Sequence, residues 1–426
     1  MLCAMESPVT REHCAALDAA DPLAFARERF VLPEGVIYLD GNSLGALPRS
    51  VAPRLREAVE RDWAHGLIRS WNDAGWYSAP QRAAARIARL IGAQPDQVMV
   101  ADSISVNLFK LLAGAIGIQR RRDPRRTVLV AERGNFPTDV YLDASVAALY
   151  GLELVCPEPH EVRQAMTLAG DRLALVQLTH VHYRSGRIHD MPGITAQAHA
   201  QGALVIWDLA HTAGAMPVSL DALEVDFAVG CGYKYLNGGA GAPAFVYVAR
   251  RWIDSFEQPL VGWHGHARPF AFEHHWEPAP GIGRLQCGTQ PVLSLLALEA
   301  ALEAFDGIDL DLLRAKSMAM TTLFTDLLEA SPGFGTEAGL GLASPREAAA
   351  RGSQVSLTHP QGYAIVQALI ARGVIGDFRA PDILRFGFAP LYLSHVDVHD
   401  AALALREVVL SRAWDRPEFL ARKAVT

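Results

Sequence analysis

The stretch "VDFAVGCGYKYLNGGAGAPAFVYVA", residues 225–249, joins two apolar runs through a segment rich in glycine and tyrosine. Each apolar run is short and rich in β-branched or aromatic residues, as expected of a buried strand. Lys234 comes just after the first run and is flanked by Tyr233 and Tyr235. Glycines around it would let the backbone approach a neighbouring group closely. The pattern therefore predicts a core strand that leads into a reactive lysine.

Similar runs upstream of this stretch predict a mostly parallel α/β sheet. Strand-like runs occur at "RTVLVAE" (126–132), "LALVQLTH" (173–180) and "ALVIWDLAH" (203–211). Helical or loop segments such as "ITAQAHAQG" (194–202) lie between several of them. Helices that alternate with strands apolar on both faces are typical of a mostly parallel sheet covered by helices.

Two helices are predicted before these strands. The segment "PQRAAARIARLIG" (80–92) has amphipathic helical spacing and ends on glycine. The segment "DSISVNLFKLLAGAIG" (102–117) is predicted to be a helix capped by one of three residues, Asp102, Ser103 or Ser105. The basic run "QRRRDPRR" (119–126) is interpreted as a solvent-exposed connection to the next strand.

Three parts of the chain differ in their pattern of helix, strand and turn residues. With 426 residues, the chain exceeds the size of one ordinary domain. A long helical pattern (290–305) precedes another amphipathic helix (311–330) and mixed elements. The sequence therefore predicts three parts: a turn-rich N-terminal arm (1–55), a large domain (56–305) and a smaller C-terminal α+β domain (306–426).

Composition argues against several classes of function. The formal net charge of −7 argues against nucleic acid as the main partner. No apolar run approaches the roughly 18 residues needed to cross a membrane. The five cysteines are scattered without a CxxC pair, which favours a reducing cytoplasm over a disulfide framework or a zinc site. Of 39 basic residues only four are lysines, Lys110, Lys234, Lys316 and Lys423, so few primary amines are available for chemistry.

Reactive side chains occur at the ends of the predicted strands, which is where ligands bind in such sheets. Asp208 ends one strand and is either a helix cap or a functional carboxylate. Thr179 ends another strand, and the loop "ERGNFPTDVY" (132–141) follows a third. In that loop Phe136 has a ring that could lie on the face of an aromatic ligand.

A strand-end lysine, a strand-end carboxylate and a capped helix N-terminus together fit one ligand, pyridoxal phosphate. Its aldehyde needs an amine, and its pyridine nitrogen needs a carboxylate to stay protonated. Its phosphate needs N–H groups and hydroxyls at the start of a helix. The sequence therefore predicts pyridoxal 5'-phosphate as the cofactor, with Lys234 as the amine and Asp208 as the carboxylate.

Five motifs give the chain a resemblance to a known family: "YLDGNSLGALP" (38–48), "FPTD" (136–139), "WDLAHTAG" (207–214), "GYKYLNGGAG" (232–241) and "VGWHGH" (261–266). From about residue 36 to about residue 395 the chain resembles the kynureninases, of the aminotransferase class V group of fold-type-I pyridoxal-phosphate enzymes. The lysine motif alone indicates only the superfamily, whereas its combination with the first and last motifs is more specific. The resemblance implies a mostly parallel sheet flanked by helices, with a smaller C-terminal α+β domain.

The resemblance implies cofactor contacts for the matching residues. Lys234 would bind the aldehyde covalently and then move the substrate's α-proton, while Tyr233 would bond the phosphate and take part in proton transfer. Asp208 would pair with the pyridinium nitrogen, with His211 beside it. The remaining implied contacts are Ile104 and Ser105 at the phosphate, Phe136 stacked on the ring, Pro137, Thr138 and Asp139 close by, Thr179 on the ring's other side, and Trp263 and Thr289 reaching across from the partner subunit of a homodimer.

The resemblance also implies a substrate and a reaction. Arg385 would bind the substrate's α-carboxylate, Asn42 and Ser43 would border the substrate, and Trp71 is a candidate for recognising its aryl ring. The implied reaction hydrolyses L-kynurenine, and also 3-hydroxy-L-kynurenine, to anthranilate or 3-hydroxyanthranilate and L-alanine. It would serve tryptophan catabolism or pyridine-nucleotide synthesis, and the sequence leaves both open.

Other functions are also considered. A metallohydrolase could use strand-end histidines such as His180, His182 and His264, although no HExxH motif is present and no metal is expected. A cysteine desulfurase or selenocysteine lyase would need a mobile catalytic cysteine, whereas Cys287, just before a long helical pattern, is expected to be packed. An aminotransferase and a non-catalytic pyridoxal-phosphate-binding regulator are the remaining alternatives.

Overall fold

The computed structural model describes residues 9–330, 335 and 339–422, so Cys3 and Lys423 lie outside the described residues. The chain separates into two compact units. The larger unit comprises Ser50–Tyr183 and His189–Glu303, and the smaller comprises Met1–Arg49, Arg184–Ile188 and Ala304–Thr426. The three-part division expected from the sequence, with bounds at residues 55 and 305, stays a prediction.

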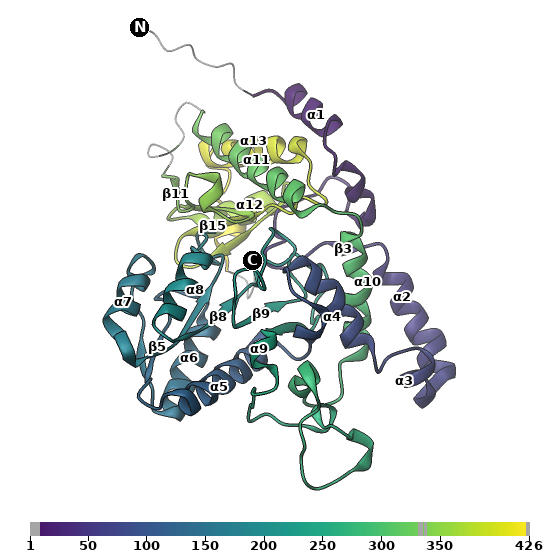
Figure 1. Ribbon diagram of the computed structural model, residues 1–426. Coiled ribbons are helices and arrows are strands. Elements are labelled where there is room, and N and C mark those ends of the chain that lie inside the picture. Colours follow the sequence, from purple (N-terminus) through teal and green to yellow (C-terminus); the bar gives the residue numbers. More distant parts are fainter. Residues whose placement is uncertain (1–8, 331–334, 336–338, 423–426) are drawn as a thin grey trace. The chain divides into compact units, whose positions relative to one another are not determined.

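A mostly parallel sheet forms the centre of the larger unit (Figure 1). Its strands follow the spatial order β4–β10–β9–β8–β7–β5–β6. Neighbours from β9 to β6 run parallel, whereas β10 is antiparallel to both β9 and β4. The strands are β4 (Val98–Val100), β5 (Val128–Val130), β6 (Glu153–Val155), β7 (Leu173–Thr179), β8 (Leu204–Asp208), β9 (Phe227–Cys231) and β10 (Ala244–Val248). The predicted α/β class is confirmed.

Helices pack around this sheet, and α5 contacts β7, β8, β9 and β10. The helix α2 continues directly into a π-helical segment, Ala58–Gly66, which the sequence reasoning did not predict. The helices of the unit are α2 (Val51–Glu57), α3 (Ser70–Asp73), α4 (Ala79–Leu90), α5 (Ile104–Arg122), α6 (Pro137–Tyr150), α7 (Val162–Ala169), α8 (Met191–Ala200), α9 (Arg250–Ile253) and α10 (Val292–Ala301).

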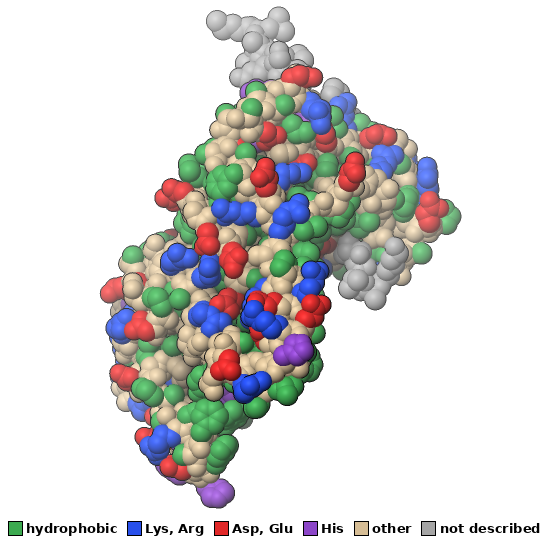
Figure 2. Space-filling view, turned by 90° about the vertical axis from the view of Figure 1, so that its right-hand side faces the viewer, with side chains coloured by type: hydrophobic (Ala, Val, Ile, Leu, Met, Phe, Trp, Pro, Cys, Tyr) green, Lys and Arg blue, Asp and Glu red, His purple; other side chains and the backbone are tan. Residues whose placement is uncertain are grey.

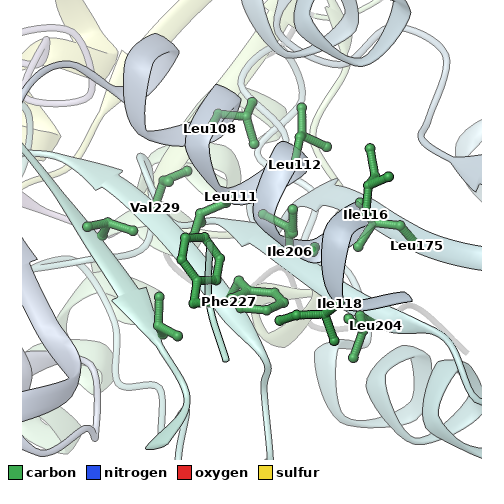
Figure 3. Packing of buried hydrophobic residues seen from close by; sticks show 14 of the residues in the cluster. Leu108, Leu111, Leu112, Ile116, Ile118, Leu175, Leu204, Ile206, Phe227 and Val229 are labelled. Carbon is green, nitrogen blue, oxygen red and sulfur yellow. The ribbon is translucent and has the colours of Figure 1, made fainter. Parts of the chain in front are cut away.

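Buried apolar side chains between α5 and the sheet form the core of the larger unit (Figure 3). The helix contributes Leu108, Leu111, Leu112 and Ile116, and the strands contribute Leu175, Leu204, Ile206, Phe227 and Val229. Burying each such side chain stabilises the fold by roughly 1.5–3 kcal/mol. This packing fixes α5 against the strands, and so fixes its N-terminus beside their carboxyl ends.

The bounds of α5 identify its N-cap residue and correct the expectation for residues 119–126. Ser103 is the N-cap, because its Oγ accepts the N–H of Val106 at 3.4 Å. The helix runs on to Arg122, so the interpretation of residues 119–126 as a connection is wrong for their first half. Arginine side chains in the last turn interact favourably with the negative end of the helix dipole, which explains why the helix continues there.

The smaller unit contains an antiparallel sheet with the strand order β11–β12–β15–β14 and two short strand pairs. The pairs are β1 with β3, antiparallel, and β2 with β13, parallel. Its strands are β1 (Phe30–Val31), β2 (Ile37–Tyr38), β3 (Leu47–Pro48), β11 (Gly341–Leu342), β12 (Gln354–Thr358), β13 (Val374–Ile375), β14 (Asp377–Arg379) and β15 (Ile383–Gly387). Its helices are α1 (Arg11–Ala19), α11 (Leu310–Glu329), α12 (Gly362–Ile370), α13 (His395–Leu410) and α14 (Pro417–Leu420).

Charges of both signs are interspersed on the face that Figure 2 presents. Acidic side chains exceed basic ones over the whole sequence by seven. Within the described part of the chain, no helix is long and apolar enough to cross a membrane.

Candidate active site

A cavity in the larger unit lies where β7, β8 and β9 end and α5 begins. Its empty volume, counted with the space at its mouth that is open to solvent, is about 690 Å³. The residues around it are Ser103, Ile104, Ser105, Phe136, Thr138, Asp139, Thr179, Tyr183, Asp208, Ala210, His211, Tyr233, Lys234, Ala242 and Ala244. The cavity thus brings together most of the residues predicted to bind the cofactor; Pro137, Trp263 and Thr289 do not line it.

Lys234 follows β9 in a turn whose backbone approaches other backbone closely. A Cβ added at Gly232 would lie 2.5 Å from the carbonyl oxygen of Pro243, and one added at Gly238 would lie 2.7 Å from that of Gly232. Only glycine fits at such distances. The turn carries Lys234 Nζ to 3.4 Å from Nε2 of His211. The glycines that surround the lysine therefore shape the turn that presents it.

Two buried carboxyl groups lie at the base of the cavity. Asp208 ends β8, and its Oδ1 accepts the N–H of Ala210 at 2.7 Å. Asp139 lies in the first turn of α6, and its Oδ2 accepts hydrogen bonds from Gln177 Nε2 at 3.1 Å and Thr179 Oγ1 at 3.3 Å. Asp139 Oδ1 is buried and has no hydrogen-bond partner among the described residues.

Burial acts on both carboxyl groups, but their neighbours differ. Burial raises the pKa of Asp208, and the positive charge of Lys234 opposes the rise. Burial also raises the pKa of Asp139 well above its usual range, and the charge of Asp208 raises it further. Like charges this close do not both ionise readily. Asp208, next to the positive charge of Lys234, is therefore the more acidic of the two carboxyl groups.

The N-terminus of α5 faces the cavity and suits an anion. N–H groups in the first turn of a helix lack partners within the helix, and the helix dipole adds partial positive charge there. Ile104 and Ser105 are the first two residues of this turn. Burial raises the pKa of Tyr233, another lining residue, so its hydroxyl stays protonated and can donate a hydrogen bond.

The aromatic wall of the cavity includes a residue that the sequence analysis missed. The rings of Phe136 and Tyr183 meet edge to face with centroids 5.3 Å apart. Lys234 Nζ lies 5.9 Å from the centroid of Phe136. Tyr183 comes four residues after Thr179, which ends a predicted strand, so its position after that strand was the available signal.

A cluster in the smaller unit contains the predicted substrate residues Arg385 and Ser43. Arg385 is buried; its Nε donates to Asp377 Oδ1 at 2.8 Å, and its Nη2 donates to Ser43 Oγ at 2.8 Å. Ser43 Oγ in turn donates to Asp377 Oδ2 at 2.6 Å. Asp377, on β14, lies opposite Arg385 on β15 in the antiparallel register. The sequence analysis missed Asp377, because only strand pairing brings it to the arginine.

Two further acidic or polar residues belong with this cluster. Burial, followed by the negative charge of Asp377, raises the pKa of Asp40 to about 7, and the charge of Arg385 opposes the rise. Asp40 Oδ1 is buried without a hydrogen-bond partner among the described residues. The predicted residue Asn42 is fully buried, and its Nδ2 donates to Gln354 Oε1 at 3.4 Å.

Besides Pro137, three predicted residues of the larger unit do not line the cavity: Trp71, Trp263 and Thr289. Trp263 stacks edge to face on His264 with ring centroids 4.0 Å apart, and Trp71 lies 6.1 Å from the same histidine. Trp263 and Thr289 are exposed to solvent. Their roles at a partner's phosphate and at the substrate's aryl ring stay predictions.

The residues considered for a metal site or as a catalytic cysteine make other contacts in the structure. His180 Nδ1 lies 3.0 Å from Thr212 Oγ1, and His182 Nε2 lies 2.9 Å from the carbonyl oxygen of Gly134. Within the described residues, no group of three or more histidine, cysteine or acidic side chains could hold a metal ion. The Sγ of Cys287 donates to the carbonyl oxygen of Leu260 at 2.8 Å, and this cysteine does not line the cavity.

Comparison with known proteins identifies the family. The kynureninase C-terminal domain family matches residues 313–405. Kynureninase of Burkholderia mallei (strain SAVP1) is 52% identical over 421 residues, which cover 98% of this chain and 100% of the relative. Over the same shares, kynureninase of Pseudomonas fluorescens is 49% identical. The chain belongs to the kynureninase family.

Solved structures show the same fold in more distant proteins. A cysteine desulfurase from Escherichia coli matches with a TM-score of 0.75 at 20% identity, over 92% of this chain and 98% of that chain. A cystine C–S lyase in complex with its product, cysteine persulfide, matches with a TM-score of 0.74 at 19% identity, over 87% and 98%. These likenesses confirm the fold-type-I architecture expected of a kynureninase family member.

Proposed function

We propose that this chain hydrolyses L-kynurenine, and also 3-hydroxy-L-kynurenine, to anthranilate or 3-hydroxyanthranilate and L-alanine, with pyridoxal 5'-phosphate as its cofactor. The observation that carries the proposal is a single cavity lined by Lys234, Asp208 and the start of α5. The chain around that cavity is 52% identical to a kynureninase over 98% of its length. The activity would serve tryptophan catabolism or pyridine-nucleotide synthesis.

The residues of the cavity fit this cofactor. The first turn of α5 and the hydroxyls of Ser105 and Tyr233 suit a phosphate. Asp208 suits the protonated pyridine nitrogen, and Lys234 suits the aldehyde. Phe136 offers a ring face; Pro137 and Thr138 begin α6, not the loop expected from the sequence, and Thr179 ends β7. Asp139 adds a second buried carboxyl group beside Asp208.

When bound, the cofactor supplies an aldehyde that joins an amine and a protonated ring that withdraws electrons from Cα. Lys234 would hold the cofactor through its amine and would remove the proton from the substrate's Cα. His211, 3.4 Å from the Lys234 amine, keeps that amine near its position in the cavity. Asp208 holds the proton on the ring nitrogen.

Cleavage of the Cβ–Cγ bond requires water to add to the aryl ketone and a proton to reach Cβ. Tyr233 is the proton donor proposed here, because its buried hydroxyl keeps its proton at neutral pH. Arg385 would bind the substrate's α-carboxylate through paired N–H groups. Asp377 accepts hydrogen bonds from Arg385 Nε and Nη2, which fixes the plane of the guanidinium.

The proposal extends to assembly and location. We propose a homodimer in which the exposed Trp263 and Thr289 contact the phosphate of the neighbouring subunit. We also propose a cytoplasmic location, because the cysteines of the described chain are all free thiols, Cys14, Cys156, Cys231 and Cys287. Asn42, Ser43 and Trp71 are proposed to border the substrate.

The experiment that tests the function mixes purified protein with pyridoxal phosphate and L-kynurenine and follows the fluorescence of anthranilate. We expect steady anthranilate production by the native chain. Lys234→Ala should lower the rate by at least about a thousandfold, because the primary amine that forms the covalent link is gone. Lys234→Arg should be equally inactive, since it keeps the charge but cannot make that link.

Reduction with borohydride and peptide mapping provide the control. The cofactor should become fixed to the peptide that contains Lys234, and circular dichroism should show that both variants are folded. Anthranilate production by folded Lys234→Ala near the native rate would contradict the assignment. Release of sulfide from L-cysteine, without anthranilate from L-kynurenine, would instead point to the cysteine desulfurase alternative.

A further inference from the structure

A second lysine of the larger unit is fully buried, and none of the roles above uses it. The side chain of Lys110 is 0% exposed and lies in the second turn of α5. Its Nζ donates to Asp102 Oδ2 at 2.5 Å and to the carbonyl oxygen of Leu285 at 2.6 Å. Burying an ammonium group is unfavourable, and a buried ion pair adds little net stability over an apolar pair.

The first contact of Lys110 holds the turn that starts α5. Asp102 lies between β4 and the N-cap Ser103, and its φ of +49° is strained for a residue with a side chain. A second side chain from the same helix reaches this turn, because Asn107 Nδ2 donates to the carbonyl oxygen of Ala101 at 2.7 Å. Two side chains of α5 thus hold the residues that set the direction of its first N–H groups.

The turn is also tied to the wall of the cavity. The N–H of Ala244, a lining residue, donates to the carbonyl oxygen of Asp102 at 2.8 Å. Moving Asp102 would therefore shift both the start of α5 and the neighbouring edge of β10. The cavity contacts most exposed to such a shift are those at Ser103, Ile104 and Ser105.

The second contact of Lys110 holds a segment that is distant in sequence. Leu285 begins the run that continues through Cys287 to Thr289. A smaller cavity is lined both by Asp102 and by Gln286, Cys287, Gly288 and Thr289, so the two segments face each other. One ammonium group joins the turn before α5 to the segment that carries Thr289.

We propose that Lys110 is a positioning residue for the cofactor's phosphate: it holds the strained Asp102 turn so that the first N–H groups of α5 point at the phosphate. This inference rests on the proposed function only for the identity of the cofactor. It predicts a loss of affinity that depends on the phosphate group. A purely structural role would weaken binding of the cofactor with and without its phosphate alike.

The test compares pyridoxal phosphate with pyridoxal, which has the same ring and aldehyde but no phosphate. Dissociation constants are measured by titrating the apoprotein and following the visible absorbance of the bound compound. Lys110→Met keeps the apolar stem and removes the charge. We expect its dissociation constant for pyridoxal phosphate to rise at least tenfold, with that for pyridoxal within about twofold of native. Asp102→Asn should have the same effect, and the double variant should add little, because all three break one pair.

The chain offers a closely matched control. Lys316 Nζ contacts Asp21 Oδ2 at 2.7 Å and the carbonyl oxygen of Pro390 at 2.6 Å, so it is another buried lysine between a carboxylate and a carbonyl. Lys316→Met should lower thermal stability without changing either dissociation constant. Unchanged affinity for pyridoxal phosphate in Lys110→Met, or an equal loss for both compounds, would overturn the inference. Should Lys110→Met not fold, the same two outcomes for Asp102→Asn decide it. Failure to hydrolyse L-kynurenine would overturn the proposed function but not this inference.

Discussion

Burial and neighbouring charges set the pKa values of single buried residues in this protein. In the smaller unit Asp377 and Asp40 share one cluster but differ in charge. Although burial opposes it, the charge and hydrogen bonds of Arg385 hold the pKa of Asp377 below its usual range. At Asp40 the charge of Arg385 does not outweigh burial and the charge of Asp377, which raise the pKa to about 7. At neutral pH the cluster therefore carries one firmly ionised acid and one acid close to its titration point.

The raised pKa of Asp40 predicts a dependence of stability on pH. The folded protein holds this proton more tightly than the unfolded chain, where the pKa of aspartate is about 3.9. The stabilisation is fully present below that value and is lost as the pH rises to about 7. We expect the Tm of the native chain to fall between about pH 4 and pH 7 relative to that of Asp40→Asn, which has no such proton to lose. Thermal unfolding of both proteins over this range is the measurement.

Asp254→Asn is the matched control, because the Asp254 side chain is almost fully exposed. Its Tm should track the native value at every pH. A constant difference in Tm between Asp40→Asn and the native chain across the range would show that Asp40 keeps an ordinary pKa.

At the scale of elements, α5 connects the core to the cavity. Its apolar side chains pack on the sheet while its first turn faces the cavity. Two glycines in its interior have opposite surroundings. A Cβ at Gly114 would lie 2.3 Å from the ring of Phe256, whereas a Cβ at Gly117 would meet only the flexible end of Arg121 at 3.6 Å. The helix is thus close-packed at one glycine and open at the other.

The two glycines predict stability changes of opposite sign. Gly114→Ala should lower the free energy of unfolding by about 1–3 kcal/mol, because the methyl group overpacks the core. Gly117→Ala should raise it by about 0.5–1 kcal/mol, because alanine is the better helix former in an open position. Denaturant unfolding of the two variants measures both values, and each serves as the control for the other. A stabilised Gly114→Ala would mean that Phe256 does not pack against this face of α5.

The sequence predicted the elements whose signals are local. The runs that became β5, β7, β8, β9 and β10 are apolar and bounded by polar residues or glycine, so their pattern alone identifies buried strands. The same strands carry Asp208, Thr179 and Lys234 at their ends, and parallel pairing brings such ends together. This rule placed Asp208, Thr179 and Lys234, whereas most other cofactor contacts were expected from the resemblance to the kynureninases.

Features that depend on contacts between distant segments were not predictable from the sequence. Nothing local to Lys110 indicates Leu285 as its partner, because the two are 175 residues apart. Asp377 meets Arg385 only through antiparallel register. The π-helical segment Ala58–Gly66 has no distinguishing composition.

At the scale of the whole molecule, exposed aromatic side chains favour assembly. Phe270 is 64% exposed and Phe272 is 78% exposed, and their ring centroids lie 6.5 Å apart. The centroid of Trp263 lies 5.8 Å from that of Phe270. Contiguous exposed apolar groups of this kind mark interaction surfaces. They neighbour Trp263, which is proposed to contact the partner's phosphate.

Disrupting this surface should separate the subunits of the proposed homodimer and lower the activity at the same time. We expect Phe272→Asp to raise the dimer dissociation constant by about tenfold or more, because it places a charge in an apolar interface. Sedimentation measures assembly, and anthranilate production at matched concentrations measures activity. Leu168→Asp on α7, at a position 77% exposed, is the control and should change neither. A monomeric Phe272→Asp variant with full activity would show that the partner subunit contributes nothing to the proposed site.

The parallel pairing of β2 with β13 has a consequence for biosynthesis. Ile37 lies opposite Val374, so a strand made at the beginning of translation pairs with one made near its end. At about 5–20 residues per second, the ribosome needs on the order of tens of seconds to deliver the second strand. Meanwhile every residue of the larger unit has emerged. Throughout that interval β2 of the nascent polypeptide has no pairing partner. The unpaired segment is then available for chaperones to bind.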